Sequence, residues 1–499
     1  MKENLKKEIE NILKNLGVQN PKVNLTVTEN TKFGDYSSNV AMAYAKELGK
    51  NPFDLAEEIK TKISMAGVKV EVVKPGFINF FFSPEYFAEK LKETEIKSGV
   101  FKGQKIIIEY TVCNVLKPMH IGHLMGNVIG ESLSRIIEST GAEVKRNNYQ
   151  GDSGLHIARA IWGIMKSGGK IEGTLSEKTK YIGEAYALGA NSYEDDEVAK
   201  KEIKELNEKI FKKEDENLNE LYKWGRQISL DHFEVLYKKL GTKFDYYFFE
   251  SEVADDALKI IREWVTKGVF EESDGAIVFK GEKFDPKLHT RVFISNQGLP
   301  MYEAKDIAHA IRKYNTYKFD KSIIVTANEQ SEYFKVVLRA MQEINPEIAS
   351  KTKHVAHGLL KLPSGKMSSR KGNTITGETL IEDVESMVQD KIKDREFNEK
   401  EKAEIAEIVA IGAIKYSILR QAIGGDIIFD FDKSISFEGD SGPYLQYSAV
   451  RANSLLERAQ FSISNFQFLI PEGWKTTNLE RYIERFPDVL ERAGMAVSY

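Results

Sequence analysis

Residues 105–149 constrain the fold more than any other part of the sequence. The apolar run KIIIEY at 105–110 predicts a buried strand, and the turn KPMHIGH at 117–123 follows it. Apolar residues then recur at helical spacing over 126–140, and a second β-rich run lies at 144–149. Strand, turn, helix and strand form a βαβ unit, in which ligands bind where the carboxyl end of a strand meets a helix N-terminus. The sequence therefore predicts a ligand site at KPMHIGH.

The residue types of this turn suit a nucleotide phosphate. His120 and His123 can donate hydrogen bonds to phosphate oxygens, and Gly122 lets a base or a ribose lie against the backbone. The N-terminus of the following helix adds N–H groups and a partial positive charge. No Gly-x-x-x-x-Gly-Lys-Ser/Thr sequence occurs, so this is not a P-loop. Two core histidines are the simpler interpretation, and the position of the turn after a strand argues against it.

A second basic stretch, KMSSRKGN, lies at 366–373 after the turn residues Pro-Ser-Gly. Cations and hydroxyls on such a loop can close over a polyphosphate and stabilise the charge that develops during its transfer. A solvated basic loop is the alternative. The candidate catalytic residues of this stretch are Lys366, Ser368, Arg370 and Lys371.

HIGH followed far downstream by KMSSR resembles the paired signatures of class I aminoacyl-tRNA synthetases. The segments IEYTVCNVLKPMHIGHL, NNYQGDSGL, LPMYEAKDIAHA and GPYLQYSAVRANSLL are similar to the arginyl-tRNA synthetase family, and the resemblance extends over most of the chain. It implies a Rossmann-like α/β catalytic domain with an N-terminal α+β domain and a C-terminal helical domain. It also implies ATP-dependent activation of L-arginine and transfer to tRNA(Arg), with Mg²⁺ accompanying ATP as a substrate ion.

One departure from the class pattern concerns lysines. Ser369 stands where many class I enzymes carry a second loop lysine, whereas many arginyl enzymes carry a lysine just before HIGH. This chain has that lysine as Lys117 and also has Lys366, which leaves open which of the two dominates.

Recognition of arginine requires a guanidinium to leave water, which carboxylates in fork geometry or aromatic rings make tolerable. The candidates near strand ends are Glu109, Tyr302 and Asp306, and the last two are four residues apart at a helix start and share one face. The resemblance assigns the guanidinium to Tyr302 and Asp306, and the amino acid to Asn114 and Gln330. Without it, a capping aspartate and a core tyrosine explain the pair equally well.

Composition excludes several classes of protein. The chain has 499 residues, a formal net charge of -4 and one cysteine, Cys113, which excludes an internal disulfide and a cysteine-rich zinc site. Because the net charge is negative, any nucleic acid must bind to a local basic face. The N-terminus reads as a charged amphipathic helix without a signal-peptide core. We expect a cytoplasmic monomer that binds no membrane and no structural metal.

Three domains are expected. Residues 1–100 form an α+β unit, which the resemblance makes a domain for the tRNA D-arm. Residues 101–376 form the catalytic domain, with a helical insertion at about 168–285 and parallel strands at 291–295 and 322–326 after it. Residues 377–499 are helical and resemble an anticodon-binding domain, and we expect this domain to be truncated because its pattern stops short.

Aromatic and amide side chains at loop, strand or helix surfaces can stack on unpaired bases or hydrogen-bond to them. Ordinary turn and core packing explains such residues about equally well. The candidate tRNA contacts are Asn39, Phe77 and Asn79 in the first domain, and Tyr444, Tyr447 and Arg451 in the last.

Three other functions fit part of the pattern. Small nucleotidylyltransferases also carry an HxGH tetrad, but they need neither the N-terminal unit nor KMSSRKGN. A tRNA-binding protein without enzymatic activity would be expected to have lost HIGH or the basic loop. A synthetase for another amino acid is disfavoured by the lack of cysteine clusters and of a large editing insertion, and by the presence of Tyr302 with Asp306.

Overall fold

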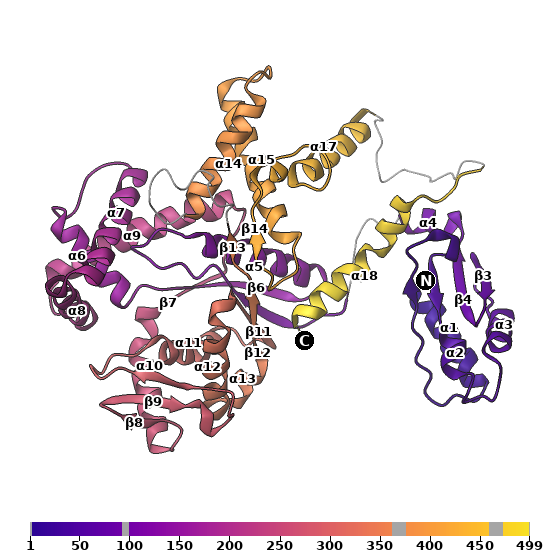
Figure 1. Ribbon diagram of the computed structural model, residues 1–499, viewed down its shortest axis with the longest axis horizontal. Helices are drawn as coiled ribbons and strands as arrows, with labels where there is room; N and C mark the ends of the chain where they lie inside the picture. Colours follow the sequence, from indigo (N-terminus) through magenta and orange to yellow (C-terminus); the bar gives the residue numbers. More distant parts are fainter. Residues whose placement is uncertain (1, 92–98, 362–375, 459–472, 499) are drawn as a thin grey trace. The chain divides into compact units, whose positions relative to one another are not determined.

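The computed structural model describes residues 2–91, 99–361, 376–458 and 473–498. The chain forms two compact units (Figure 1). The first contains Met1–Ser98 and Gln460–Glu491, and the second contains Gly99–Ala459 and Arg492–Tyr499. No helix within the described ranges is long and apolar enough to cross a membrane.

The first unit is an α+β domain, as predicted for residues 1–100. Its antiparallel sheet has the strand order β1-β2-β4-β3. In the first helix, Leu5, Ile9 and Leu13 recur at a spacing of four and are fully buried, which fixes the helix face that packs on the core. The elements are α1 (Lys2–Asn15), β1 (Thr26–Val27), β2 (Tyr36–Ser38), α2 (Val40–Tyr44), α3 (Pro52–Lys62), β3 (Val68–Val73), β4 (Phe77–Phe82) and α4 (Pro84–Leu91).

The first part of α18 (Asn478–Ser498) also belongs to this unit. Arg481 Nε donates to Asp35 Oδ1 at 2.6 Å, and Tyr86 donates from its hydroxyl to Glu484 at 2.9 Å. Residues 473–491 of the expected C-terminal helical region therefore lie in the first unit.

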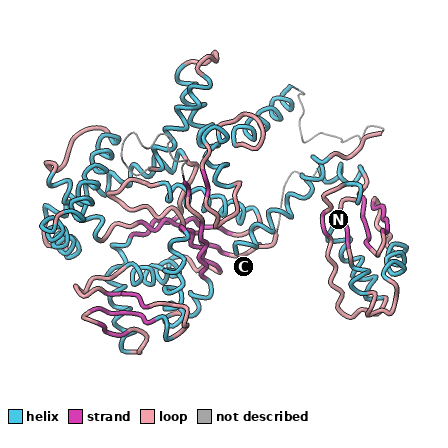
Figure 2. Tube along the Cα trace, viewed as in Figure 1, coloured by secondary structure: helices cyan, strands magenta, loops and turns pink. Residues whose placement is uncertain are grey.

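The second unit is built on a five-stranded parallel sheet with the order β12-β11-β5-β6-β7. Figure 2 shows these strands gathered between helices. The helix α5 (Ile121–Ser139) connects β5 to β6, so the predicted βαβ unit is confirmed. The strand order reverses between β5 and β11, and their carboxyl ends form the switch point at which such sheets bind ligands. The strands are β5 (Lys105–Glu109), β6 (Glu143–Gln150), β7 (Tyr246–Phe249), β11 (Lys321–Ala327) and β12 (Thr352–His357).

Alternation along β5 sends its side chains to two different cores. Ile106 and Ile108 pack in a core that includes residues of α5, α14 (Gly377–Ile392) and α15 (Glu399–Leu419). Ile107 packs on the opposite face, in a core to which three later helices contribute. Those helices are α10 (Glu250–Thr266), α11 (Tyr302–Thr316) and α12 (Ser331–Ile344).

One strand prediction was wrong. The strand predicted at 291–295 is β10 (Thr290–Ile294), and it lies in a separate antiparallel sheet with β8 (Glu271–Ser273) and β9 (Ala276–Lys280). Asp274 and Gly275, both with positive φ, form a two-residue turn that reverses the chain between β8 and β9. An apolar run alone could not distinguish this hairpin sheet from a parallel strand. The strand predicted at 322–326 does belong to the parallel sheet, as β11.

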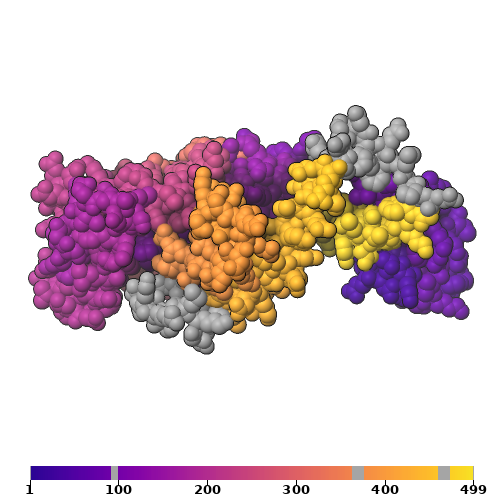
Figure 3. All heavy atoms as spheres, turned by 90° about the horizontal axis from the view of Figure 1, so that it is seen from above, coloured from indigo at the N-terminus to yellow at the C-terminus, as the bar shows by residue number. Residues whose placement is uncertain are grey.

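The helices expected in the insertion at 168–285 are present, and β7 within that range forms an edge of the main sheet. The helix α9 (Glu216–Lys239) contacts α14 through Lys239 and Glu385 at 3.3 Å, and through His232 and Glu378 at 3.1 Å. In the space-filling view, the orange surface of the segment around residues 380–420 lies beside the purple and magenta surface of the second unit (Figure 3). The remaining elements are α6 (Leu155–Lys166), α7 (Leu175–Asp195), α8 (Glu197–Lys212), α9 (Glu216–Lys239), α13 (Pro346–Lys351), β13 (Leu360–Lys361), β14 (Ile427–Ile428), α16 (Phe431–Ser434) and α17 (Gly442–Arg458).

Candidate active site

The turn that carries the two histidines lies between β5 and α5. His120 is the N-cap of α5, and its Nδ1 accepts a hydrogen bond from Gly122 N at 3.1 Å. His123 Nδ1 accepts one from His120 N at 3.3 Å, and the two rings stack with their centroids 3.6 Å apart. This reciprocal pair satisfies helix N–H groups in the way that a capping box does. A Cβ on Gly122 would lie 2.9 Å from the ring of His120, so the ring position requires a glycine there.

These bonds determine where the imidazole protons lie. Because each Nδ1 accepts from a backbone N–H, each neutral ring carries its proton on Nε2, the nitrogen that can donate to a phosphate oxygen. Burial, followed by the charge of Lys117, lowers the pKa of His120 to about 4. Burial, His120 and Lys117 hold the pKa of His123 well below its usual range. Both rings are therefore neutral at pH 7 and offer hydrogen bonds without positive charge.

The basic stretch lies outside the described residues, but the chain resumes beside the histidine turn. Thr376 forms an antiparallel bridge with His120, and Gly377 N donates to Met119 O at 2.8 Å. Thr376 and Gly377, three and four residues after KMSSRKGN, are thus attached to the HIGH turn. The candidates Lys366, Ser368, Arg370 and Lys371 all fall in the stretch that is not described.

Glu109 ends β5 and is already paired inside the protein. Its Oε2 accepts from Lys313 Nζ and from Asn147 Nδ2, each at 2.8 Å, and lies 2.8 Å from His309 Nε2. Burial raises the pKa of this carboxyl, but the charges of Lys313 and His309 outweigh burial and leave the pKa well below its usual range. A guanidinium at Glu109 would have to compete with the buried Lys313.

Asp306 differs from the carboxylates around it. It is partly exposed on α11, and Tyr333 donates from its hydroxyl to Oδ2 at 2.7 Å. Burial raises the pKa of Asp306 to about 8, and the charges of Glu109, Glu250 and Glu303 add to the rise. Across the described ranges, no cation lies within ion-pair distance of its carboxylate.

The three carboxylates that raise this pKa each have a cation of their own. Besides the Glu109 pair, Glu250 contacts Lys305, and Glu303 lies 3.0 Å from Arg291. Asp306 is thus the carboxylate at which this pocket lacks a positive charge. An incoming cation would neutralise this carboxylate and lower its pKa.

The other predicted arginine-binding residues are Tyr302, Asn114 and Gln330, and of these Tyr302 lies on the same helix as Asp306. Tyr302 begins α11, so it shares a helix face with Asp306 as predicted, and a Cβ on Gly154 would lie 3.9 Å from its hydroxyl. Asn114, in the loop after β5, forms a parallel bridge with Gly151, which lies in the loop after β6 together with Gly154. Gln330 lies after β11, one turn before Tyr333, and is exposed.

Sequence reasoning missed Asp152, which fixes that loop. Its Oδ2 accepts from Arg226 Nε at 3.0 Å, from the hydroxyl of Tyr222 at 3.0 Å and from Ser251 Oγ at 2.8 Å. The side chain is fully buried, so the loop after β6 is tied to α9 and α10. An aspartate between glycines directly after a buried strand, in GDSG, was the available signal.

The predicted tRNA contacts of the first unit differ in exposure. Phe77 is 41% exposed and Asn39 is exposed. Asn79 is only 4% exposed, and its Oδ1 accepts a hydrogen bond from Ser37 Oγ at 2.7 Å, so its amide is bonded within the sheet. In the second unit, the predicted side chains all lie exposed on α17; they are Tyr444, Tyr447 and Arg451.

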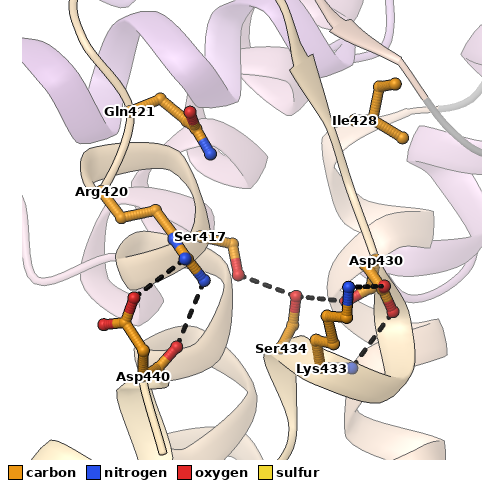
Figure 4. A pocket seen from close by; sticks show the side chains of 8 residues that line it. All are labelled: Ser417, Arg420, Gln421, Ile428, Asp430, Lys433, Ser434 and Asp440. Carbon is orange, nitrogen blue, oxygen red and sulfur yellow. Dashed lines mark hydrogen bonds and ion pairs between the residues drawn. The ribbon is translucent and has the colours of Figure 1, made fainter.

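A cavity of about 320 Å³ lies between α15, β14 and α16 (Figure 4). Its charged groups satisfy one another: Arg420 lies 2.8 Å from Asp440, and Lys433 lies 3.5 Å from Asp430. Ser417 likewise donates to Ser434 at 2.7 Å. None of the predicted site residues lines this cavity, so we do not assign the chemistry to it.

The parallel sheet, with a HIGH turn at its switch point, defines the catalytic fold of a class I aminoacyl-tRNA synthetase. Residues 88–431 match the family described as "tRNA synthetases class I (R), catalytic domain", and residues 2–82 match "Arginyl tRNA synthetase N terminal domain". The chain belongs to the arginyl-tRNA synthetase family.

Individual relatives agree with this assignment. The arginine–tRNA ligase of Fusobacterium nucleatum is 33% identical over 98% of this chain and 86% of its own length. That of Borrelia hermsii is 33% identical over 89% of this chain and 79% of its own length. The arginyl-tRNA synthetase of Thermus thermophilus has the same fold, with a TM-score of 0.80 at 24% identity over 100% of this chain and 88% of that one.

Proposed function

We propose the residue roles by which this chain catalyses the arginine–tRNA ligase reaction of its family. In that reaction the carboxylate of L-arginine attacks the α-phosphorus of ATP, and diphosphate leaves. Arginyl-adenylate then passes its aminoacyl group to the terminal ribose of tRNA(Arg), and AMP is released. No protein nucleophile is required, so the rate depends on positioning the reactants and neutralising their charge.

The single observation that supports these roles best is the unbalanced carboxylate of Asp306 beside the switch point of the sheet. A partly buried carboxylate without a cation is unfavourable until a positive ligand arrives. The planar guanidinium of arginine fits this need, because it stays charged and can bond a carboxylate through two N–H groups. Tyr302 would stack on the guanidinium, and Asn114 and Gln330 would hold the amino-acid end.

At the other end of the site, His120 and His123 would donate from Nε2 to the phosphates of ATP. Because both rings are neutral, the positive charge there would come from Lys117 and from the basic stretch with Lys366, Arg370 and Lys371. Mg²⁺ would arrive with ATP and neutralise part of the phosphate charge.

Glu109 would act on the pocket indirectly. Since Lys313 and His309 already satisfy its carboxylate, we assign it a positioning role instead of a direct contact with the guanidinium. It would hold His309 and Lys313 in place on the helix that carries Asp306.

Two surfaces would serve the tRNA. The exposed Phe77 and Asn39 of the first unit would contact the D-arm, and α17 would present Tyr444, Tyr447 and Arg451 to the anticodon loop. We further propose that the enzyme acts as a monomer in the cytoplasm.

Diphosphate exchange with each amino acid in turn, with and without tRNA, tests the assignment. We expect exchange with arginine alone among the amino acids, and a requirement for tRNA. Exchange with another amino acid, or none with arginine, would refute the assignment.

A further inference from the structure

Tyr149 is a buried side chain next to the proposed arginine pocket to which the roles above give no task. It lies near the carboxyl end of β6 and is 4% exposed. Its ring stacks on His309, with the centroids 3.8 Å apart and the planes 6° apart. His309 in turn lies 2.8 Å from Glu109, so the Tyr149 ring is packed against a side chain that is itself fixed.

The polar end of this ring is unsatisfied. The hydroxyl oxygen of Tyr149 is buried and has no hydrogen-bond partner in the described part of the chain. Burial and the charges of Glu250, Asp306 and Glu109 hold its pKa well above the usual range, so the hydroxyl keeps its proton. Buried hydroxyls are nearly always bonded, and an orphan of this kind indicates a missing ligand or water.

The surroundings indicate which ligand chemistry is missing. Asp306 and Glu250 lie close enough for their charges to act on Tyr149, yet neither accepts a bond from it. Asn147, two residues earlier on the same face of β6, also has an unpartnered amide oxygen. A pocket with a carboxylate and spare oxygen acceptors suits a cation with several N–H donors, and a guanidinium has five.

We propose that Tyr149 is a specificity-determining residue, whose hydroxyl oxygen accepts one N–H of the guanidinium that Asp306 neutralises. The inference rests on the proposed function, since it places arginine in this pocket. Because Asp306 is partly exposed, the guanidinium can reach it from solvent. The hydroxyl oxygen of Tyr149 then accepts a hydrogen bond from an N–H that is not bonded to Asp306. A shorter or non-planar cation would leave that hydroxyl unbonded and would bind less well.

A structural water is the competing explanation. A cavity of about 20 Å³ beside Asp306 and His309 is large enough for one water molecule. If such a water alone satisfied the hydroxyl, removing the hydroxyl would not change how the enzyme distinguishes arginine from its analogues.

The test is Tyr149→Phe in the full chain, which keeps the ring and its stacking on His309. We expect the KM for arginine in tRNA charging to rise roughly tenfold or more, because a hydrogen bond to a charged group is lost. The KM for ATP should not change. Tyr181→Phe is the matched control, since that hydroxyl donates to Gly169 O at 2.7 Å within the helical insertion and should leave both constants unchanged.

Nω-methyl-L-arginine, which has one N–H fewer, sharpens the test. The wild-type enzyme should discriminate against it more strongly than Tyr149→Phe does, because the variant has already lost an acceptor. Equal discrimination, or equal changes in the KM for arginine and for ATP, would overturn the inference. A wild-type chain that charges no arginine would overturn the proposed function and this inference together, whereas an active wild type with an unchanged Tyr149→Phe variant would overturn this inference alone.

Discussion

The two ends of the proposed active site have opposite electrostatic needs. At the phosphate end, the protein removes charge from its histidines: both rings are buried and neutral, and each is held by a backbone N–H. At the arginine end, the protein pairs its carboxylates with internal cations and leaves Asp306 without one.

The difference teaches where ligand charge is needed. An anionic ligand at the histidine turn must be neutralised by groups other than the histidines. A cationic ligand at Asp306 would instead neutralise a carboxylate that has no cation in the empty pocket. In the proposed complex, directional hydrogen bonds from the histidines would bind the first ligand, and a charge pair with Asp306 would bind the second.

The largest expected effect is on Asp306→Asn. The variant would leave the guanidinium unpaired in a partly dry site, at a cost of about 3–5 kcal/mol, or roughly a hundredfold to several thousandfold in kcat/KM for arginine. Asp255→Asn, an exposed aspartate on α10, is the control and should behave as wild type. Near-normal arginine activation by Asp306→Asn would remove the contrast between the two ends.

Glu109→Gln should affect folding more than substrate binding. It leaves the buried Lys313 without its carboxylate, which should lower the free energy of unfolding by about 3–5 kcal/mol, measured with urea. Replacing both partners, as Glu109→Met with Lys313→Met, should restore part of the loss. If stability were unchanged while the KM for arginine rose as it does with Asp306→Asn, Glu109 would be a direct ligand.

The pH dependence should also separate the two ends. Since the pKa of Asp306 is about 8 in the empty pocket, the KM for arginine should fall by several-fold as the pH rises from 7 to 8.5 and the carboxyl ionises. The KM for ATP should stay flat over this range, because the pKa of His120 is about 4. A KM for arginine that did not change with pH would contradict the raised pKa.

The raised pKa of Asp306 also determines the direction in which stability changes with pH. The folded carboxyl binds its proton more tightly than an unfolded one, whose pKa is 3.8, so the contribution of Asp306 to stability falls as the pH rises from 4 to 8. Bound arginine should reverse this trend.

Gly151→Ala should have a moderate effect at the arginine end. Its Cβ would lie 2.0 Å from Asn114 Oδ1, so Asn114 must move, and kcat/KM for arginine should fall about tenfold. Gly99→Ala is the control, because a Cβ there meets nothing within 4 Å. An equal loss in both variants would show that the effect is not local.

The smallest effect is expected outside both ends. Phe77→Ala should raise the KM for tRNA by a few-fold through lost stacking on a base, without changing the KM for ATP. Phe33→Ala, which removes another exposed ring of the same unit, provides the comparison. Equal changes in the two constants would argue against a tRNA contact at Phe77.

Much of the fold and one local feature of the candidate site were predictable from residue order. The βαβ unit at 105–149 and the shared face of Tyr302 and Asp306 follow from spacings within one or two elements. The antiparallel placement of β10 was not predictable, because an apolar run does not state which strand it pairs with.

The sequence by itself determined the HIGH turn, since its residues interact within four positions of one another. Only the tertiary structure decided which of the carboxylates in this region is left without a cation among the described residues. Lys313 reaches Glu109 from 204 residues away, and Tyr149 meets His309 only because β6 and α11 pack together. The charge balance of a pocket depends on such long-range contacts, and a list of residue types does not contain them.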